Sequence, residues 1–136
     1  MAIIKWVDSF EETKNNKLIE LNKKCNDTIL GRFSSEVDGV IYYFSHDSEA
    51  QSNFSTAKLA FMDGTVAQMG GVIPWTAYDS EGNVFRLQLN QSQFNSVFLS
   101  KMLHVTNNVA KYRDFLVPLV IDAKTPEEIK SITWDK

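Results

Sequence analysis

The chain has 136 residues, of which 43% are apolar and 23% are charged, and its formal net charge is −3. This length predicts one domain, with a core that needs neither a disulfide nor a metal. The acidic balance excludes a general binder of DNA or RNA and of membrane surfaces. The one cysteine, Cys25, lies on an apolar helical stripe, which indicates a core position.

The N-terminal segment predicts a strand followed by a helix. Residues 2–7 are predicted to form a short strand. Polar residues follow them too soon for a signal peptide or a membrane span, so we expect a protein of the cytosol, or of a particle that is assembled in the cytosol. Ser9 and Glu12 form a capping box that starts a helix, which ends at Gly31. Its apolar stripe consists of Leu18, Leu21, Cys25 and Ile29.

The middle of the chain predicts a strand, a helix and a hairpin. Residues 39–44 are β-branched and aromatic, as in a strand, and Asp47 or Ser48 caps a helix that ends at Asp63 and Gly64. His46, in the turn between them, is read as a surface residue. Residues 72–78 and 84–89 form a hairpin in which Pro74 requires an edge or a bulge. The alternation places Phe85, Leu87 and Leu89 on its buried face.

A long helix is predicted over residues 91–122. Asn90 and Gln93 have capping-box spacing, and Pro118 should kink or end the helix near residue 117. Its apolar residues follow a heptad seam, which predicts packing on a partner as well as on its own domain. The seam consists of Phe98, Met102, Val105, Val109, Tyr112, Leu116 and Leu119. Thr125 and Pro126 start a last helix, which completes an α+β order with a small antiparallel sheet.

The sequence offers no support for catalysis and two candidate regions for binding. No metal-ligand spacing, nucleophile elbow or phosphate-binding loop is present, so no metal or cofactor is expected. A nucleotide site needs an aromatic ring for the base and neighbouring cations for the phosphates. The same aromatic residues also suit a protein core, and the same cations also suit a solvated helix face. The candidate ligand residues are Trp75, Phe85, Arg86, Asn90, His104, Asn107, Asn108, Lys111 and Arg113, and a second anion site is Lys23 with Lys24.

Several segments resemble a small phage-encoded domain. These are residues 17–33, the aromatic run 42–44, the stretch 73–75, the acidic turn 79–82, the lead from Leu87 to Phe94, and the closing segment 116–134. Freestanding domains of this kind are similar to the Thoeris anti-defence 1 family. The resemblance implies a sponge that binds a cyclic ADP-ribose isomer, or cyclic oligonucleotides, without cleaving it. It also implies a homo-oligomer, a dimer or hexamer, with ligand pockets at dimer interfaces, in the cytoplasm of the infected bacterial host.

Two other functions stay open at this point. Related domains lie at the ends of phage tail-fibre proteins, so the chain could be a tail-associated protein whose long helix makes a structural contact. An enzyme that acts on a nucleotide is the third alternative. The sponge and the structural protein differ in whether a small ligand binds, and the sponge and the enzyme differ in whether that ligand stays intact.

Overall fold

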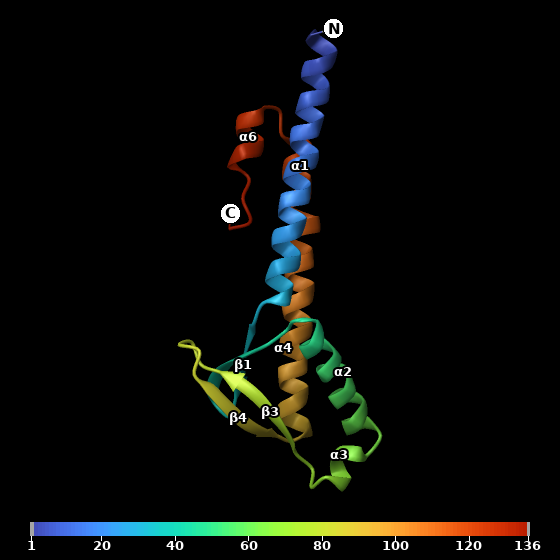
Figure 1. The fold of residues 1–136 in the computed structure, drawn as a ribbon, viewed down its shortest axis with the longest axis vertical. Helices are drawn as coiled ribbons and strands as arrows, with labels where there is room; N and C mark the ends of the chain where they lie inside the picture. The colour runs from blue at the N-terminus through green and yellow to red at the C-terminus, as the bar shows by residue number, and fades with distance from the viewer. Residues whose placement is uncertain (1, 136) are drawn as a thin grey trace. The chain divides into compact units, whose positions relative to one another are not determined.

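The computed structural model describes the backbone of residues 2–135 and the side chains of residues 9–135. The fold is α+β as predicted, with an N-terminal helix, a four-stranded antiparallel sheet, a middle helix, a long helix over residues 91–122 and a short final helix (Figure 1). The chain divides into two compact units. We call Met1–Thr28 with Thr106–Lys136 the helical unit, and Ile29–Val105 the sheet unit. The expectation of a single domain stays a prediction.

The first element, α1, is one helix over Ala2–Leu30. The strand predicted over residues 2–7 is therefore wrong, and Ser9 lies inside the helix, where its carbonyl accepts a hydrogen bond from Thr13 Oγ1 at 2.8 Å. A helix satisfies its backbone groups within the segment, whereas a β-branched run forms a strand only beside a neighbouring strand. The predicted end of the helix at Gly31 is confirmed, because Leu30 is the last helical residue.

The long helix consists of three consecutive segments: α4 over Gln91–Ala110, a π-helical turn η1 over Lys111–Leu116, and α5 over Val117–Asp122. The predicted capping box is confirmed at its start. Gln93 N donates to Asn90 Oδ1 and Asn90 N donates to Gln93 Oε1, both at 2.9 Å.

The predicted disturbance before Pro118 takes the form of this π turn. Val117 N donates to the carbonyl of Tyr112, five residues back rather than four. A proline ring clashes with the carbonyl four residues earlier in an α-helix, and an extra residue in the preceding turn relieves that clash. The extra residue also rotates the residues beyond it, so Val120 is buried more deeply than the predicted seam residue Leu119.

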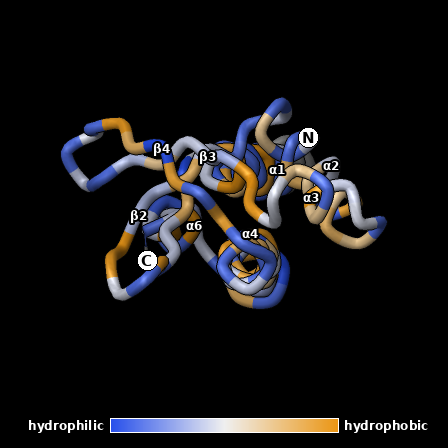
Figure 2. The backbone as a smooth tube through the Cα atoms, turned by 90° about the horizontal axis from the view of Figure 1, so that it is seen from below, coloured by the Kyte–Doolittle hydropathy of each residue, from blue (hydrophilic) through white to orange (hydrophobic). Residues whose placement is uncertain are grey.

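The heptad seam is only partly buried. Leu116 is buried and Met102 is 42% exposed. The buried residues of α4 are Phe94, Val97 and Lys101. None of these three belongs to the predicted seam, so a different stripe of α4 is buried. Both hydrophobic and hydrophilic residues lie around α4 when it is viewed from its end (Figure 2).

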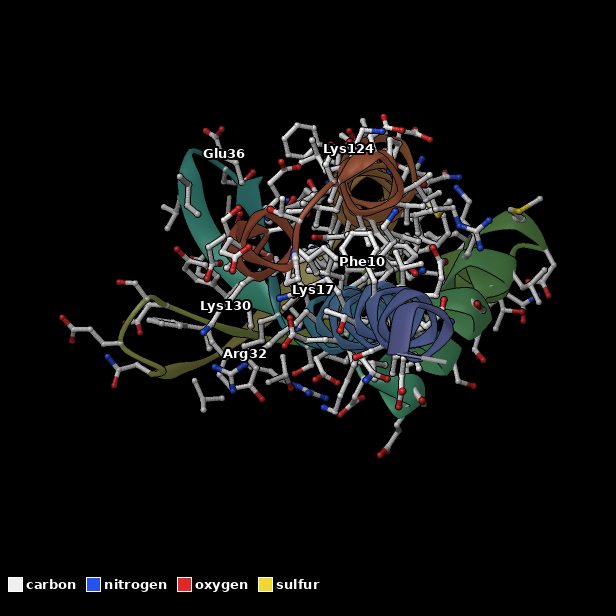
Figure 3. The ribbon with its side chains drawn as sticks, turned by 90° about the horizontal axis from the view of Figure 1, so that it is seen from above. Phe10, Lys17, Arg32, Glu36, Lys124 and Lys130 are labelled. Atoms are coloured by element: carbon white, nitrogen blue, oxygen red, sulfur yellow. The ribbon has the colours of Figure 1, made fainter. Side chains whose placement is uncertain are left out.

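The helical unit has an aliphatic core. Leu21 of α1 packs with Leu116, Val120 and Ile132. Tyr112 Oη donates to the Leu18 carbonyl at 3.3 Å. The short final helix, α6 over Pro126–Ser131, begins as predicted, because Thr125 Oγ1 accepts from Glu128 N at 3.2 Å. α1 and α6 line a depression of about 350 Å³, with Lys17 and Lys130 on its walls (Figure 3).

The sheet is an antiparallel meander in the order β1-β2-β3-β4. Its strands are β1 over Phe33–Val37, β2 over Val40–Phe44, β3 over Ile73–Tyr78 and β4 over Val84–Leu89. β1 was not predicted. The turn that joins β1 to β2 has a positive φ at Asp38 (53°) and Gly39 (83°), as a two-residue type I′ hairpin requires.

The middle helix, α2, covers Ser48–Met62 and is followed by a short helix, α3, over Thr65–Gln68. The predicted cap is Asp47, whose Oδ1 accepts from Ala50 N at 2.9 Å. α2 and α4 pack against one face of the sheet around an aromatic core. Its fully buried rings are Phe44, Phe54 and Phe94.

The predicted β3–β4 hairpin is confirmed, with Trp75 opposite Leu87 and Thr76 opposite Arg86. The predicted buried face is confirmed for Leu89 and for the partly buried Leu87, whereas Phe85, on the same face, is largely exposed. Burial falls along β4 toward the turn, so Phe85 is 40% exposed and contacts Tyr42 at a ring-centroid distance of 5.6 Å.

Candidate functional site

A cleft opens in the sheet unit where β2 and β3 separate. Their ladder consists of the single pair Tyr43 and Tyr78, although β3 pairs with β4 along its whole length. Beyond that pair the chain leaves β2 at Ser45 and turns into α2. The cleft that results has a volume of about 490 Å³ and lies between α2 and β3.

The α2 wall of the cleft is made of small and uncharged polar side chains. α2 contributes Ala50, Ala57 and Ala60 here, and Asn53 and Thr56 add an amide and a hydroxyl. Small side chains leave space beside a strand that larger ones would fill. The remaining wall is formed by Ser45, Met69, Ile73, Pro74, Trp75, Thr76 and Arg86.

Two of the predicted ligand residues, Trp75 and Arg86, meet at this cleft. Trp75 is half-buried, and its ring lies 4.7 Å from that of Phe54 and 5.8 Å from that of Phe94, so its position is fixed by the core. Arg86 is exposed and donates from Nη1 to Thr76 Oγ1 at 2.6 Å. The arrangement combines a fixed aromatic ring with a tethered guanidinium.

The other predicted residues of the sheet unit lie outside the walls of this cleft. Phe85 contacts Tyr42, and Asn90 uses its Oδ1 to cap α4. His104 Nε2 lies 3.1 Å from the carbonyl of Ile29, within a buried cluster. Each of these three side chains has an intramolecular contact that explains its place in the fold.

The cluster around His104 includes His46, which is 1% exposed. The reading of His46 as a surface residue is therefore wrong, because the residue sits where the turn enters the core, with Nδ1 2.6 Å from the Ile29 carbonyl. Its Nε2 has no hydrogen-bond partner among the described residues. Burial lowers the pKa of His46 below its ordinary value of 6.5; the hydrogen bond to Ile29 opposes this shift, and the charges of Lys101 and His104 add to it.

Lys101 is the third member of the cluster. It is buried, with Nζ 5.3 Å from the ring centroid of Phe98 and 6.0 Å from that of Phe54. Burial lowers the pKa of its ammonium group. Among the described residues, no three or more His, Cys, Asp or Glu side chains gather as a metal site would require.

The predicted residues that remain belong to the helical unit. Lys111 Nζ lies 4.3 Å from the ring centroid of Trp134, and the backbone carbonyl of Asn108 accepts from Cys25 Sγ at 3.4 Å. Asn107 and Arg113 are exposed. Cys25 is buried as predicted, and burial raises the pKa of its thiol, against a smaller opposing effect of the Arg113 charge.

The predicted second anion site lies on α1. Lys23 Nζ forms an exposed ion pair with Asp27 Oδ2 at 2.7 Å. Lys24 lines a depression of about 490 Å³ with Glu20, Asp27 and Trp134 among others. Acidic side chains therefore accompany both lysines, which reduces the positive potential available to an anion there.

Sequence reasoning missed the cleft residues Asn53, Thr56 and Thr76. The signal that could have found the first two is their position on the same face of α2 as Ala57 and Ala60, at helical spacing. Comparisons with protein-family models, curated proteins and solved structures found no match. None of the helices in the described part of the chain is both long and apolar enough to cross a membrane.

Proposed function

We propose that this chain binds a cyclic nucleotide signal, a cyclic ADP-ribose isomer or a cyclic oligonucleotide, in the α2–β3 cleft and sequesters it uncleaved as a phage anti-defence protein. The observation that carries the proposal is that Trp75 and Arg86 line the same cleft. A base stacks on an aromatic ring, and a guanidinium forms charge-assisted hydrogen bonds to phosphate.

The size and chemistry of the cleft support this proposal. Its volume of about 490 Å³ lies in the range of small-molecule sites. Asn53 and Thr56 offer hydrogen bonds to a ribose, and Ala57 leaves room for a planar ring. Arg86 is already oriented by its bond to Thr76, so less side-chain entropy is lost when it binds an anion.

The test is calorimetry with cyclic ADP-ribose isomers and cyclic trinucleotides, followed by recovery of the ligand from denatured protein. We expect binding, with the ligand recovered intact. Arg86→Gln should weaken binding by about 10- to 100-fold, since a hydrogen bond to a charged group contributes about 1.5–3 kcal/mol. Absence of heat with every ligand would overturn the proposal and favour the structural alternative, and recovery of a cleaved product would favour an enzyme.

The matched control is Arg32→Gln. Arg32 is also an exposed arginine of the sheet unit, but its guanidinium lies 3.5 Å from the ring centroid of Tyr78 and outside the cleft walls. This variant should bind the ligand as the wild type does. An equal loss in both variants would indicate a general effect of net charge rather than a contact with Arg86.

The proposal includes a homo-oligomer, a dimer or hexamer, formed through the long helix. Leu99 (60% exposed), Met102 (42%) and Leu103 (48%) leave apolar surface on α4. We expect a dimer or larger in size-exclusion chromatography, and a shift toward monomer in Leu99→Glu/Met102→Glu, because a charge is costly to bury in an apolar contact. Leu59→Glu, on exposed α2 surface, is the control, and unchanged elution of the double variant would contradict this assembly.

A further inference from the structure

Among the described residues, part of the β3 backbone next to the cleft has no partner strand. In an antiparallel sheet, the N–H and C=O groups of successive residues point alternately to the two neighbouring strands. Asp79 N donates to the Asn83 carbonyl at 3.1 Å, across the turn that joins β3 to β4. By alternation, Ile73, Trp75 and Ala77 pair with β4, and Pro74, Thr76 and Tyr78 point the other way, toward β2.

Two further observations agree with this alternation. Tyr78 is the residue of β3 that pairs with Tyr43 of β2. Pro74 has no N–H to donate, so it fits only where no ladder bond is needed. Trp75 and Thr76 point to opposite faces of the sheet, yet both line the cleft. The cleft must therefore lie beside the edge of β3, where side chains of both faces reach it.

Pro74 and Thr76 therefore offer an acceptor followed by a donor on one open edge. In the described chain, the ladder between β2 and β3 ends at Tyr43 and Tyr78, so neither the Pro74 carbonyl nor the Thr76 N–H has a strand partner there. The cleft beside them is walled by Ala57 and Ala60, which leave space for a flat group.

We propose that this edge of β3 recognises an adenine base whose N1 is unsubstituted, as in a cyclic ADP-ribose isomer closed through its riboses, with the N6 amino group donating to the Pro74 carbonyl and N1 accepting from the Thr76 N–H. The proposal rests on the proposed nucleotide-binding function and names the base. In the same register guanine places O6 against the carbonyl and its N1–H against the N–H, so both contacts become repulsive. Arg86, tethered to the hydroxyl of Thr76, holds a positive charge for phosphate next to this base-reading edge.

The first test compares ligands on the wild-type chain by calorimetry, with AMP, 1-deaza-AMP, 7-deaza-AMP and GMP. AMP and 7-deaza-AMP should bind equally, because N7 takes no part. 1-Deaza-AMP and GMP should bind about tenfold more weakly or worse, as expected for a lost hydrogen bond at a desolvated site. Equal binding of AMP and 1-deaza-AMP overturns the proposal.

The second test removes the backbone donor. Thr76→Pro deletes the N–H but leaves the β3–β4 ladder intact, because residue 76 faces away from β4, as Pro74 does. We expect the preference for AMP over 1-deaza-AMP to disappear. Thr76→Val, the matched control, keeps the N–H and removes the hydroxyl that holds Arg86, so the preference should persist even if both affinities fall.

The outcomes separate this proposal from the function on which it rests. If AMP binds and Arg86→Gln weakens it, but the preference over 1-deaza-AMP is absent, nucleotide binding stands and adenine recognition by β3 is wrong. If none of the four nucleotides and none of the cyclic ligands binds, both are wrong. Circular dichroism of Thr76→Pro checks its fold, and the ligand series on the wild type does not depend on that variant.

Discussion

The two units of the chain have cores of different chemistry. The sheet unit buries Phe44, Phe54 and Phe94 at 0% exposure, whereas the helical unit is centred on Leu21, Leu116 and Val120. Aromatic rings bury more surface each and pack in fixed edge and tilted arrangements. The cleft with Trp75 lies in the sheet unit, where a rigid aromatic core and an incompletely paired strand occur together. The difference indicates that packing on the aromatic core is what positions Trp75 in the candidate site.

The largest expected effect comes from Phe54→Ala in the sheet unit. Phe54 is fully buried, and the rings of Phe33, Trp75 and Phe94 surround it at centroid distances of 4.7–6.1 Å. Its truncation should lower the free energy of unfolding by about 3–5 kcal/mol. Leu116→Ala, its counterpart in the helical unit, should cost about 2–5 kcal/mol. Urea unfolding of both variants measures the comparison.

Phe115→Ala is the control for these truncations. Phe115 neighbours Leu116 in the π turn but is exposed, so its loss should change the free energy of unfolding far less. If Phe54→Ala cost no more than Phe115→Ala, the aromatic cluster would not be the stabilising core of the sheet unit. The same variants, tested for ligand binding, show whether damage to that core reaches the cleft.

Most of the fold was predictable because its signals are local. The caps at Asp47, Asn90 and Thr125 each lie at the start of the helix they predicted. β1 carries local signals as well, because Phe33, Ser35 and Val37 alternate inward and Asp38-Gly39 forms its turn. The apolar run over residues 2–7 carries a similar signal but is helical, because strand formation depends on a partner that the sequence does not identify.

The cleft was harder to predict because it results from a missing pairing. Trp75 and Arg86 were named as a stacking ring and a cation, and both line it. Nothing in the sequence shows that the ladder between β2 and β3 ends after one pair, which is what exposes the edge at Thr76. His46 was misread for a related reason. Its neighbour Asp47 is an exposed cap, and sequence does not show that the chain turns inward between them.

A smaller effect is expected from the helix caps, which offer a matched pair between the units. Asp47→Ala in the sheet unit and Thr125→Ala in the helical unit each remove an oxygen that accepts a backbone N–H. Each should cost about 1 kcal/mol of unfolding free energy. The conservative changes Asp47→Asn and Thr125→Ser keep an acceptor and should cost only a few tenths of a kcal/mol. A full loss in the conservative variants would mean that the side chains act through something other than the cap.

The smallest expected effect is a loss of stability in acid, and it arises in the sheet unit alone. Both histidines of the chain lie in that unit, and the folded structure lowers the pKa of His46 below 6.5, chiefly through burial. The unfolded chain therefore binds a proton more readily than the folded one, so the stability that a neutral His46 contributes is complete above pH 6.5 and falls as the pH drops toward the folded pKa. The charged groups that face it are Lys101, His104 and Asp47, of which the first two oppose protonation.

Urea unfolding at pH 7.5, 6.5 and 5.5 should show the free energy of unfolding declining at the acidic end. His46→Phe should flatten that decline, even though this variant loses the hydrogen bond to Ile29. Equal slopes for the wild type and His46→Phe would place the acid sensitivity elsewhere in the chain.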